Sequence, residues 1–236
     1  MRKIWFITLF PDLIKECLSQ GVIGKYFSEG EVEFITLNPS DYCVKGFKGV
    51  DSAPYGGSPG MVLRADILFN CLNEGVLRHY TSINDLHVIY PTPRGKQWSN
   101  LEAKKLLLEF EQKDIVFICG RYEGVDERFL QKYVTMEFSI GDYVLSGGEL
   151  AATIMLDTTL RFKESVLGNS LSAKCDSFEG NLLDSPKYTR PRIFQGLKVP
   201  DILLSGNHQK IAEYDEQQRH EQTLKFRPDL LKNIGE

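Results

Sequence analysis

Three glycine-containing segments follow apolar runs, and their residue types could hold a ligand. Residues 120–124 read GRYEG after the run 115–119, and residues 141–149 read GDYVLSGGE after the run 138–140. Residues 91–95, PTPRG, follow the run 86–90. Glycine lets a backbone approach a ligand closely and adopt positive φ. Each segment alone is more typical of a simple turn, but together they indicate a binding site.

A parallel sheet would bring these segments to one edge. Residues 115–119 and 138–140 each read as a buried strand followed by a glycine-bounded loop and then a helix. Two such units in succession predict parallel strands. Ligands of open α/β sheets bind at the carboxyl ends of the strands. We therefore expect these loops on the ligand-binding face.

The remaining pattern predicts an α/β part followed by a mainly helical tail. Further strands are expected at 3–9, 31–37 and 86–90, and helices from Pro11, over 64–80, after Ser99 and from 147–149 through Leu160. Residues 42–61 are rich in glycine and proline and predict irregular structure. Small and turn-forming residues dominate 168–188. A helix is expected from Asp201 or Asn207 to Thr223, and a short last one from Pro228.

Composition and motifs exclude several classes. No segment matches G-x-G-x-x-G or G-x-x-x-x-G-K-[ST], which disfavours a dinucleotide or P-loop site. The net charge of −4 argues against coating nucleic acid by bulk charge, although local basic patches remain compatible. The five cysteines contain no C-x-x-C pair, which fits a reducing compartment. No apolar run has transmembrane length, so we expect a cytoplasmic protein without a membrane partner.

Several motifs resemble the bacterial tRNA (guanine-N1)-methyltransferase family. They are PYGGSPGM at 54–61, CGRYEG at 119–124, SIGDYVLSGGEL at 139–150, DSF at 176–178, YTRP at 188–191 and LSGNH at 204–208. The likeness extends from Phe10 to Pro228 and so covers nearly the whole chain.

The resemblance implies a SPOUT methyltransferase fold, in which the C-terminal part of a parallel sheet is threaded as a trefoil knot. Knots are very rare, and neither composition nor periodicity predicts one here. The implied domains are a knotted α/β S-adenosylmethionine-binding domain (1–165), an interdomain linker or lid (166–180) and a helical tRNA-binding domain (181–236). The resemblance also implies a homodimer whose sites are shared between subunits. The implied substrate is the guanine 3′-adjacent to the tRNA anticodon.

The same resemblance implies the site residues. Asp176 would be the general base and Arg161 the essential arginine, while Glu123 would lie near the positive end of the donor. The resemblance also implies that a magnesium ion assists methyl transfer, but it assigns no ligands to that ion. The expected donor-binding residues are Tyr90, Pro91, Gly120, Tyr122, Glu123, Gly124, Ile140, Gly141, Tyr143, Leu145, Gly147 and Gly148, with Pro59 and Gly60 nearby.

Each assignment has a structural alternative. Asp176 could cap a helix that begins near Phe178. Arg161 could complement a helix dipole at a C-terminus, and Glu123 could do so in a first turn. A set of basic residues could form an ordinary solvated surface or contact phosphates: Lys45, Lys48, Arg190, Arg192, Lys198, Lys210, Arg219, Lys225 and Arg227.

Two other functions remain open at this point. One is an inactive tRNA-binding relative, and the other is a SPOUT methylase that acts on another RNA. The chain departs from the family pattern at Ala53, at Ser58 and in the acidic stretch 213–216. These departures bear on tRNA contacts more than on methyl transfer.

Overall fold

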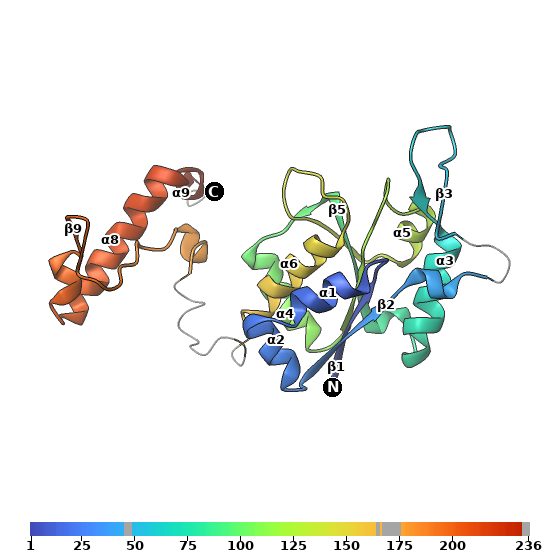
Figure 1. Cartoon of the computed structure of the whole chain (residues 1–236), viewed down its shortest axis with the longest axis horizontal. Coiled ribbons are helices and arrows are strands. Elements are labelled where there is room, and N and C mark those ends of the chain that lie inside the picture. The colour runs from blue at the N-terminus through green and yellow to red at the C-terminus, as the bar shows by residue number, and fades with distance from the viewer. Residues whose placement is uncertain (45–48, 164–165, 167–175, 233–236) are drawn as a thin grey trace. The chain divides into compact units, whose positions relative to one another are not determined.

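Five parallel strands form the central sheet of the N-terminal part of the chain (Figure 1). Their order across the sheet is β2-β1-β6-β5-β7. The predicted parallel sheet is thereby confirmed. The strands are β1 (Arg2–Ile7), β2 (Val32–Leu37), β5 (Leu86–Gln97), β6 (Asp114–Ile118) and β7 (Met136–Ser139).

The computed structural model describes residues 1–44, 49–163, 166 and 176–232 of the chain. By its internal contacts the chain divides into a first unit, Met1–Gly168, and a second unit, Asn169–Glu236. Lys45 and Lys48 lie outside the described residues. The expected linker or lid at 166–180 lies largely outside the described residues.

Alternating side chains of the strands build two cores, one on each face of the sheet. Ile4, Ile115 and Phe117 are buried on one face together with helices α1, α2, α4 and α6. Trp5 and Val116 are buried on the other face, with α3, the helical turns that follow it, and α5. The helices are α1 (Pro11–Leu18), α2 (Gly21–Ser28), α3 (Ala65–Asn70), α4 (Asn100–Phe110), α5 (Glu127–Tyr133) and α6 (Glu149–Leu160).

The helix predicted over 64–80 is observed from Ala65 to His79, but it is not regular. It begins as α3, continues as a π-helical segment, Cys71–Val76, and ends in a 3₁₀ turn, Leu77–His79. The predicted apolar face, Ile67, Leu68, Cys71 and Leu72, is buried as expected. In the predicted irregular segment, β3 (Asp51–Ser52) forms a short antiparallel pair with β4 (Val62–Leu63).

The expectation that a strand ends at Tyr90 is wrong. Strand β5 continues to Gln97, and both Pro91 and Lys96 pair with Phe138 of β7. Residues 92–95 therefore form a bulge within the strand instead of a loop after it. A Cβ on Gly95 would lie 2.4 Å from the backbone nitrogen of Phe138, so only glycine fits against β7 there.

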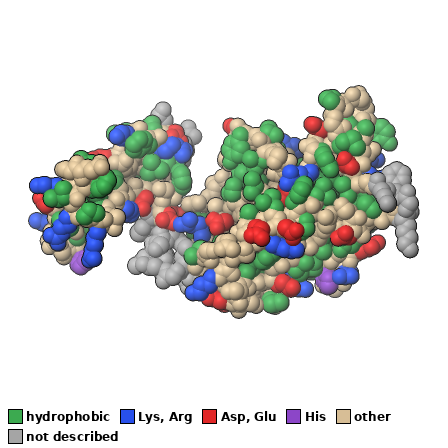
Figure 2. Space-filling model, viewed as in Figure 1, with side chains coloured by type: hydrophobic (Ala, Val, Ile, Leu, Met, Phe, Trp, Pro, Cys, Tyr) green, Lys and Arg blue, Asp and Glu red, His purple; other side chains and the backbone are tan. Residues whose placement is uncertain are grey.

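The second unit is built around the long helix α8 (His208–Phe226), whose N-terminus is capped by the side chain of Asn207. A 3₁₀ turn, Asp201–Leu204, precedes it, and α9 (Asp229–Lys232) follows. The unit also contains an antiparallel hairpin of β8 (Ile193–Phe194) and β9 (Leu197–Lys198), which the sequence pattern did not predict. Basic side chains are scattered over its visible surface (Figure 2).

Candidate active site

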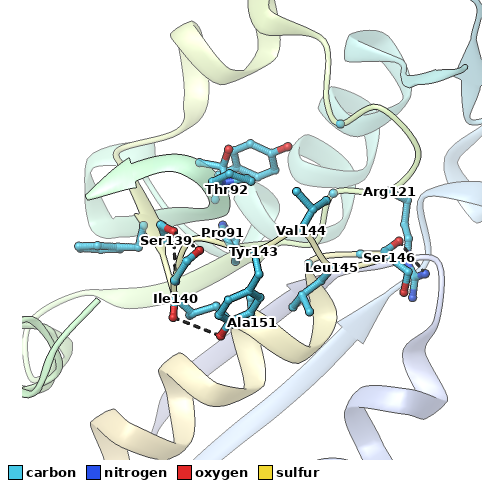
Figure 3. Close-up of a pocket in the computed structure, with 18 of the residues that line it drawn as sticks. Pro91, Thr92, Arg121, Ser139, Ile140, Tyr143, Val144, Leu145, Ser146 and Ala151 are labelled. Atoms are coloured by element: carbon cyan, nitrogen blue, oxygen red, sulfur yellow. Dashed lines mark hydrogen bonds between the residues drawn. The ribbon is translucent and has the colours of Figure 1, made fainter. Parts of the chain in front are cut away.

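The three glycine-containing segments meet around one cavity of about 260 Å³ at the carboxyl edge of the sheet (Figure 3). This volume lies near the lower end of the roughly 300–1,000 Å³ typical of small-molecule sites. Twelve of the fourteen predicted donor-binding residues line it. They are Tyr90, Pro91, Gly120, Tyr122, Glu123, Gly124, Ile140, Gly141, Tyr143, Leu145, Gly147 and Gly148.

Pro59 and Gly60, predicted to lie nearby, are not part of the cavity wall. A Cβ on Gly60 would lie 2.4 Å from Cγ of Glu123, so Gly60 packs directly against that side chain. The backbone nitrogen of Glu123 donates to the carbonyl oxygen of Met61 at 2.9 Å. The segment around Pro59 therefore supports the wall from behind Glu123.

The side chain of Tyr90 packs against Gly120 and Gly124 of the 120–124 loop. This side chain is buried, and a Cβ on Gly120 would lie 2.9 Å from its hydroxyl oxygen. Burial raises the pKa of Tyr90 above its ordinary value, so the phenol stays protonated at neutral pH. Tyr90 therefore acts here as a neutral packing surface.

Tyr122 has a backbone conformation that non-glycine residues rarely adopt, with a φ of 58°. Its side chain is 56% exposed, so core packing does not compensate for this conformation. Strained residues of this kind concentrate at functional sites. The conformation places Tyr122 in the cavity wall between Arg121 and Glu123.

The 140–148 loop forms the opposite wall. The hydroxyl group of Tyr143 donates to the carbonyl oxygen of Ile140 at 3.2 Å, a contact drawn in Figure 3. Tyr143 and Val144 are 55% and 84% exposed. The loop thus presents backbone groups and partly exposed side chains to a ligand.

Sequence reasoning did not assign several residues of the wall. Arg121 is the only charged one among them, and its position between two glycines was the available signal. The others are Thr92, Pro93, Phe138, Ser139, Val144, Ser146 and Ala151. Cys119 adjoins the wall, and burial raises the pKa of its thiol well above the ordinary value. A neutral thiol of this kind is a poor nucleophile.

Arg161 does not line the cavity. It follows the last residue of α6, and its backbone nitrogen donates to the carbonyl oxygen of Asp157 at 3.1 Å. Helix α6 begins at Glu149, directly after Gly148 of the cavity wall, and has 12 residues. At a rise of 1.5 Å per residue the helix is about 18 Å long. The structure therefore places Arg161 at the opposite end of α6 from the glycine loops of its own chain.

Asp176 belongs to the second unit and lies in a turn. The alternative that it caps a helix beginning near Phe178 is wrong. Phe178 has a left-handed φ of 75° and precedes only a three-residue 3₁₀ turn, Glu179–Asn181. The backbone nitrogen of Glu179 donates to the carbonyl oxygen of Asp176 at 3.3 Å.

Two side chains of α8 hold the segment that follows Asp176. Arg219 donates to the carbonyl oxygen of Glu179 at 3.0 Å, and its side chain is only 18% exposed. The hydroxyl oxygen of Thr223 accepts from the backbone nitrogen of Leu183 at 2.8 Å. Arg219 is therefore engaged within the unit and is not an ordinary solvated cation.

Within the described residues, no three His, Cys, Asp or Glu side chains gather in a way that could hold a metal ion. Over the same part of the chain, no helix has the length and apolar character needed to span a membrane.

Comparison with known proteins assigns the family. The model of the family described as tRNA (Guanine-1)-methyltransferase TrmD matches residues 2–233. The chain belongs to this family. Among curated tRNA (guanine-N(1)-)-methyltransferases, it is 41% identical to the protein of Hahella chejuensis over 98% of its own length and 88% of that relative. It is 43% identical to the protein of Buchnera aphidicola, over 98% and 86% of the two chains. The protein of Limosilactobacillus fermentum is 41% identical over 98% and 90%.

Proposed function

We propose that the protein transfers a methyl group from S-adenosylmethionine to N1 of a guanine in tRNA, the guanine 3′-adjacent to the anticodon. The observation that carries this proposal is the cavity in which twelve predicted donor-binding residues come together. Family membership over almost the whole chain supports the reaction and the substrate class.

The cavity suits a methyl donor that is bound mainly by backbone groups of the protein. Its walls consist of three chain segments, and five of the wall residues are glycines, which expose their backbone to the cavity. Glu123 supplies a carboxylate. A carboxylate there would favour the positive charge of a sulfonium by opposite-charge attraction. The bound donor would supply an activated methyl group. The protein then has to orient guanine and manage one proton.

Asp176 is the proposed general base. Guanine N1 carries a proton and is a poor nucleophile until that proton leaves. A carboxylate within hydrogen-bond reach takes the proton during the attack of N1 on the methyl group. The negative charge that develops spreads to O6, where the guanidinium of Arg161 would stabilise it.

The length of α6 supports a homodimer in which each site is shared. An arginine about 18 Å along the helix from the donor loops cannot reach a methyl group held by its own chain. The Arg161 that serves one cavity would therefore come from a second copy. Leu150 and Ile154 lie one helical turn apart on α6 and are 45% and 44% exposed, although they are large and apolar. A second copy covering this face would bury them.

Further assignments follow from the family. The second unit would bind tRNA, with exposed Arg190, Arg192 and Lys198 available to phosphates. The family resemblance leads us to propose that the 120–124 and 140–148 loops take part in a trefoil knot; the hydrogen bond between Gly148 and Gly120 brings the two loops into contact. A protein that modifies tRNA would work in the cytoplasm.

The decisive experiment measures methyl transfer to two matched tRNA transcripts, one with guanine and one with adenine at the target position. Nucleosides of the product are identified by mass spectrometry. We expect N1-methylguanosine from the guanine transcript only. Equal incorporation into both would contradict the substrate, and no incorporation with donor bound would favour an inactive tRNA-binding relative. Methylation of another RNA alone would favour the remaining alternative.

A further inference from the structure

Glu149 carries a buried carboxylate beside the cavity; one oxygen accepts a hydrogen bond, and the other forms an ion pair that lacks hydrogen-bond geometry. The side chain is 1% exposed, and it does not line the cavity. Thr8, just beyond the end of β1, donates its hydroxyl hydrogen to Oε1 at 2.7 Å. Oε2 lies 2.9 Å from Nε of Arg121 in an ion pair. A buried carboxylate is costly unless it is paired in this way.

Arg121 extends this contact to both glycine loops. It belongs to the 120–124 loop, and its Nη1 donates to the carbonyl oxygen of Ser146 in the 140–148 loop at 3.1 Å (Figure 3). A Cβ on Gly147 would lie 2.3 Å from Nε of Arg121, so that backbone rests directly on the guanidinium. The guanidinium also lies 4.1 Å from the ring centroid of Phe10.

The sheet itself does not fix the two loops relative to each other. They follow β6 and β7, which are not neighbours, because β5 lies between them. No ladder of strand hydrogen bonds therefore joins the two loops at the cavity. Within the described residues, the loops are joined by the contact of Gly148 with Gly120 and by the contacts of Arg121 with Ser146 and Glu149.

We propose that Glu149 is a positioning residue for the methyl donor. By holding Arg121 it sets the distance between the two walls of the cavity, although it does not touch the ligand. This inference rests on the proposed function, since it takes the cavity to be the donor site. An ion pair with a purely structural role would change stability and leave donor affinity intact.

Glu149→Gln tests the inference in the full-length protein. Glutamine keeps the size of the side chain and can still accept from Thr8, but it removes the negative charge that faces Arg121. Affinity for S-adenosylhomocysteine, the demethylated donor, is measured by calorimetry, together with KM for the donor, KM for tRNA and Tm. We expect donor Kd and donor KM to rise together by roughly tenfold, the scale of a 1.4 kcal/mol change, with KM for tRNA unchanged.

Asp114→Asn is the matched control. Asp114 is also a buried carboxylate in an ion pair, 3.4 Å from Nη1 of Arg2, and it accepts from the hydroxyl of Tyr80. It begins β6, at the end of that strand opposite the cavity. This substitution should lower Tm without changing donor Kd. If Glu149→Gln lowers Tm and leaves donor Kd unchanged, Glu149 has only a structural role.

A double variant separates positioning from direct contact. If Glu149 acts through Arg121, then Arg121→Gln with Glu149→Gln should weaken donor binding no more than the worse single change. Losses that add fully would overturn the inference. Should Glu149→Gln fail to fold, Arg121→Lys replaces it. Lysine keeps the positive charge but lacks the planar guanidinium that contacts Ser146 and Glu149. Unchanged donor affinity in this variant would count against the proposal. Absence of donor binding in the unaltered protein would contradict the proposed function instead.

Discussion

The backbone nitrogen of Gly148 donates to the carbonyl oxygen of Gly120 at 2.8 Å, which joins the loops that follow β6 and β7. The two residues are so close that a Cβ on Gly148 would lie 2.9 Å from the backbone nitrogen of Gly120. The three atoms nearest to such a Cβ, the nitrogen of Gly120 and Cα and C of Cys119, all belong to the backbone, so none of them can rotate away. The φ of Gly148 is −79°, and the requirement for glycine is therefore one of space.

Gly148→Ala should separate the loops and weaken donor binding. Overpacking of this kind costs about 1–3 kcal/mol, so we expect Kd for S-adenosylhomocysteine to rise roughly tenfold or more. Calorimetry measures this directly. Gly206→Ala is the control: Gly206 has a φ of +70° but no neighbour within 4 Å of an added Cβ. It should reduce stability through backbone strain and leave donor affinity unchanged.

Asp176→Asn should remove the base while preserving the shape of the turn. We expect kcat to fall by roughly 10²–10⁴-fold, the usual scale for losing a general base, with donor Kd unchanged. Single-turnover methylation of the guanine transcript gives the rate. A rate close to that of the unaltered protein would show that Asp176 is not the base.

Arg219→Gln should lower kcat through the turn that follows Asp176. The arginine donates to the carbonyl oxygens of Glu179 and Leu183, and glutamine would lose at least one of these contacts. Arg219→Lys should restore only part of the activity, since lysine lacks the planar guanidinium that donates to both carbonyl oxygens. The same single-turnover assay applies. If Arg219→Gln changes the salt dependence of tRNA affinity but leaves the single-turnover rate at saturating tRNA unchanged, then Arg219 contacts a phosphate of the tRNA instead.

A shared site predicts complementation between two impaired variants, assayed at a donor concentration below KM of the unaltered protein. Arg161→Ala and Gly148→Ala damage different halves of the site, so mixed dimers would contain one cavity with an intact glycine loop and an intact partner arginine. We expect activity to reappear after the two proteins are denatured together and refolded. Each variant refolded alone is the control. No recovery in mixed dimers isolated by two affinity tags would contradict sharing between subunits.

His87 should make the first unit less stable in mild acid. Its side chain is largely buried, and burial lowers the pKa of the imidazole, a shift that nearby Lys113 reinforces and Glu109, 3.5 Å away, opposes. Because the folded pKa lies below the unfolded value, the stability that His87 contributes is present above about pH 6.5 and is lost as the pH falls toward the folded pKa.

Urea unfolding at pH 7.5 and pH 5.5 measures this loss. The unaltered protein should lose more unfolding free energy between these pH values than His87→Gln does. His220→Gln, which alters an exposed histidine of α8, should behave like the unaltered protein. Equal losses in the unaltered protein and His87→Gln would show that His87 does not govern acid stability.

The central sheet and the cavity could be predicted because apolar runs ending in glycine leave a strong local signal. Other elements lack such a signal. Helix α2 contains two glycines, which disfavour a helix, and Ile23 and Tyr26 are held by burial in the core. The β8–β9 hairpin turns at Gln195 and Gly196, both with positive φ, whereas asparagine is the more usual residue before glycine in such turns.

The ion pair beside the cavity could not be predicted from spacing. Arg121 and Glu149 are separated by a helix and a strand, and Thr8 is 141 residues from Glu149. Only the position of β1 beside β6 brings Thr8 to the carboxylate. Glu149 reads locally as an ordinary acidic residue in the first turn of a helix.

Five residues of the cavity wall are glycines, and much of the surface that they present is main chain. An inhibitor that hydrogen-bonds to these backbone groups would contact atoms that no single substitution removes. Replacing a glycine such as Gly148, which packs against the backbone of Gly120, would also weaken binding of the methyl donor. Resistance to such a compound should therefore arise at Tyr122, Tyr143 or Val144, whose side chains are more than half exposed.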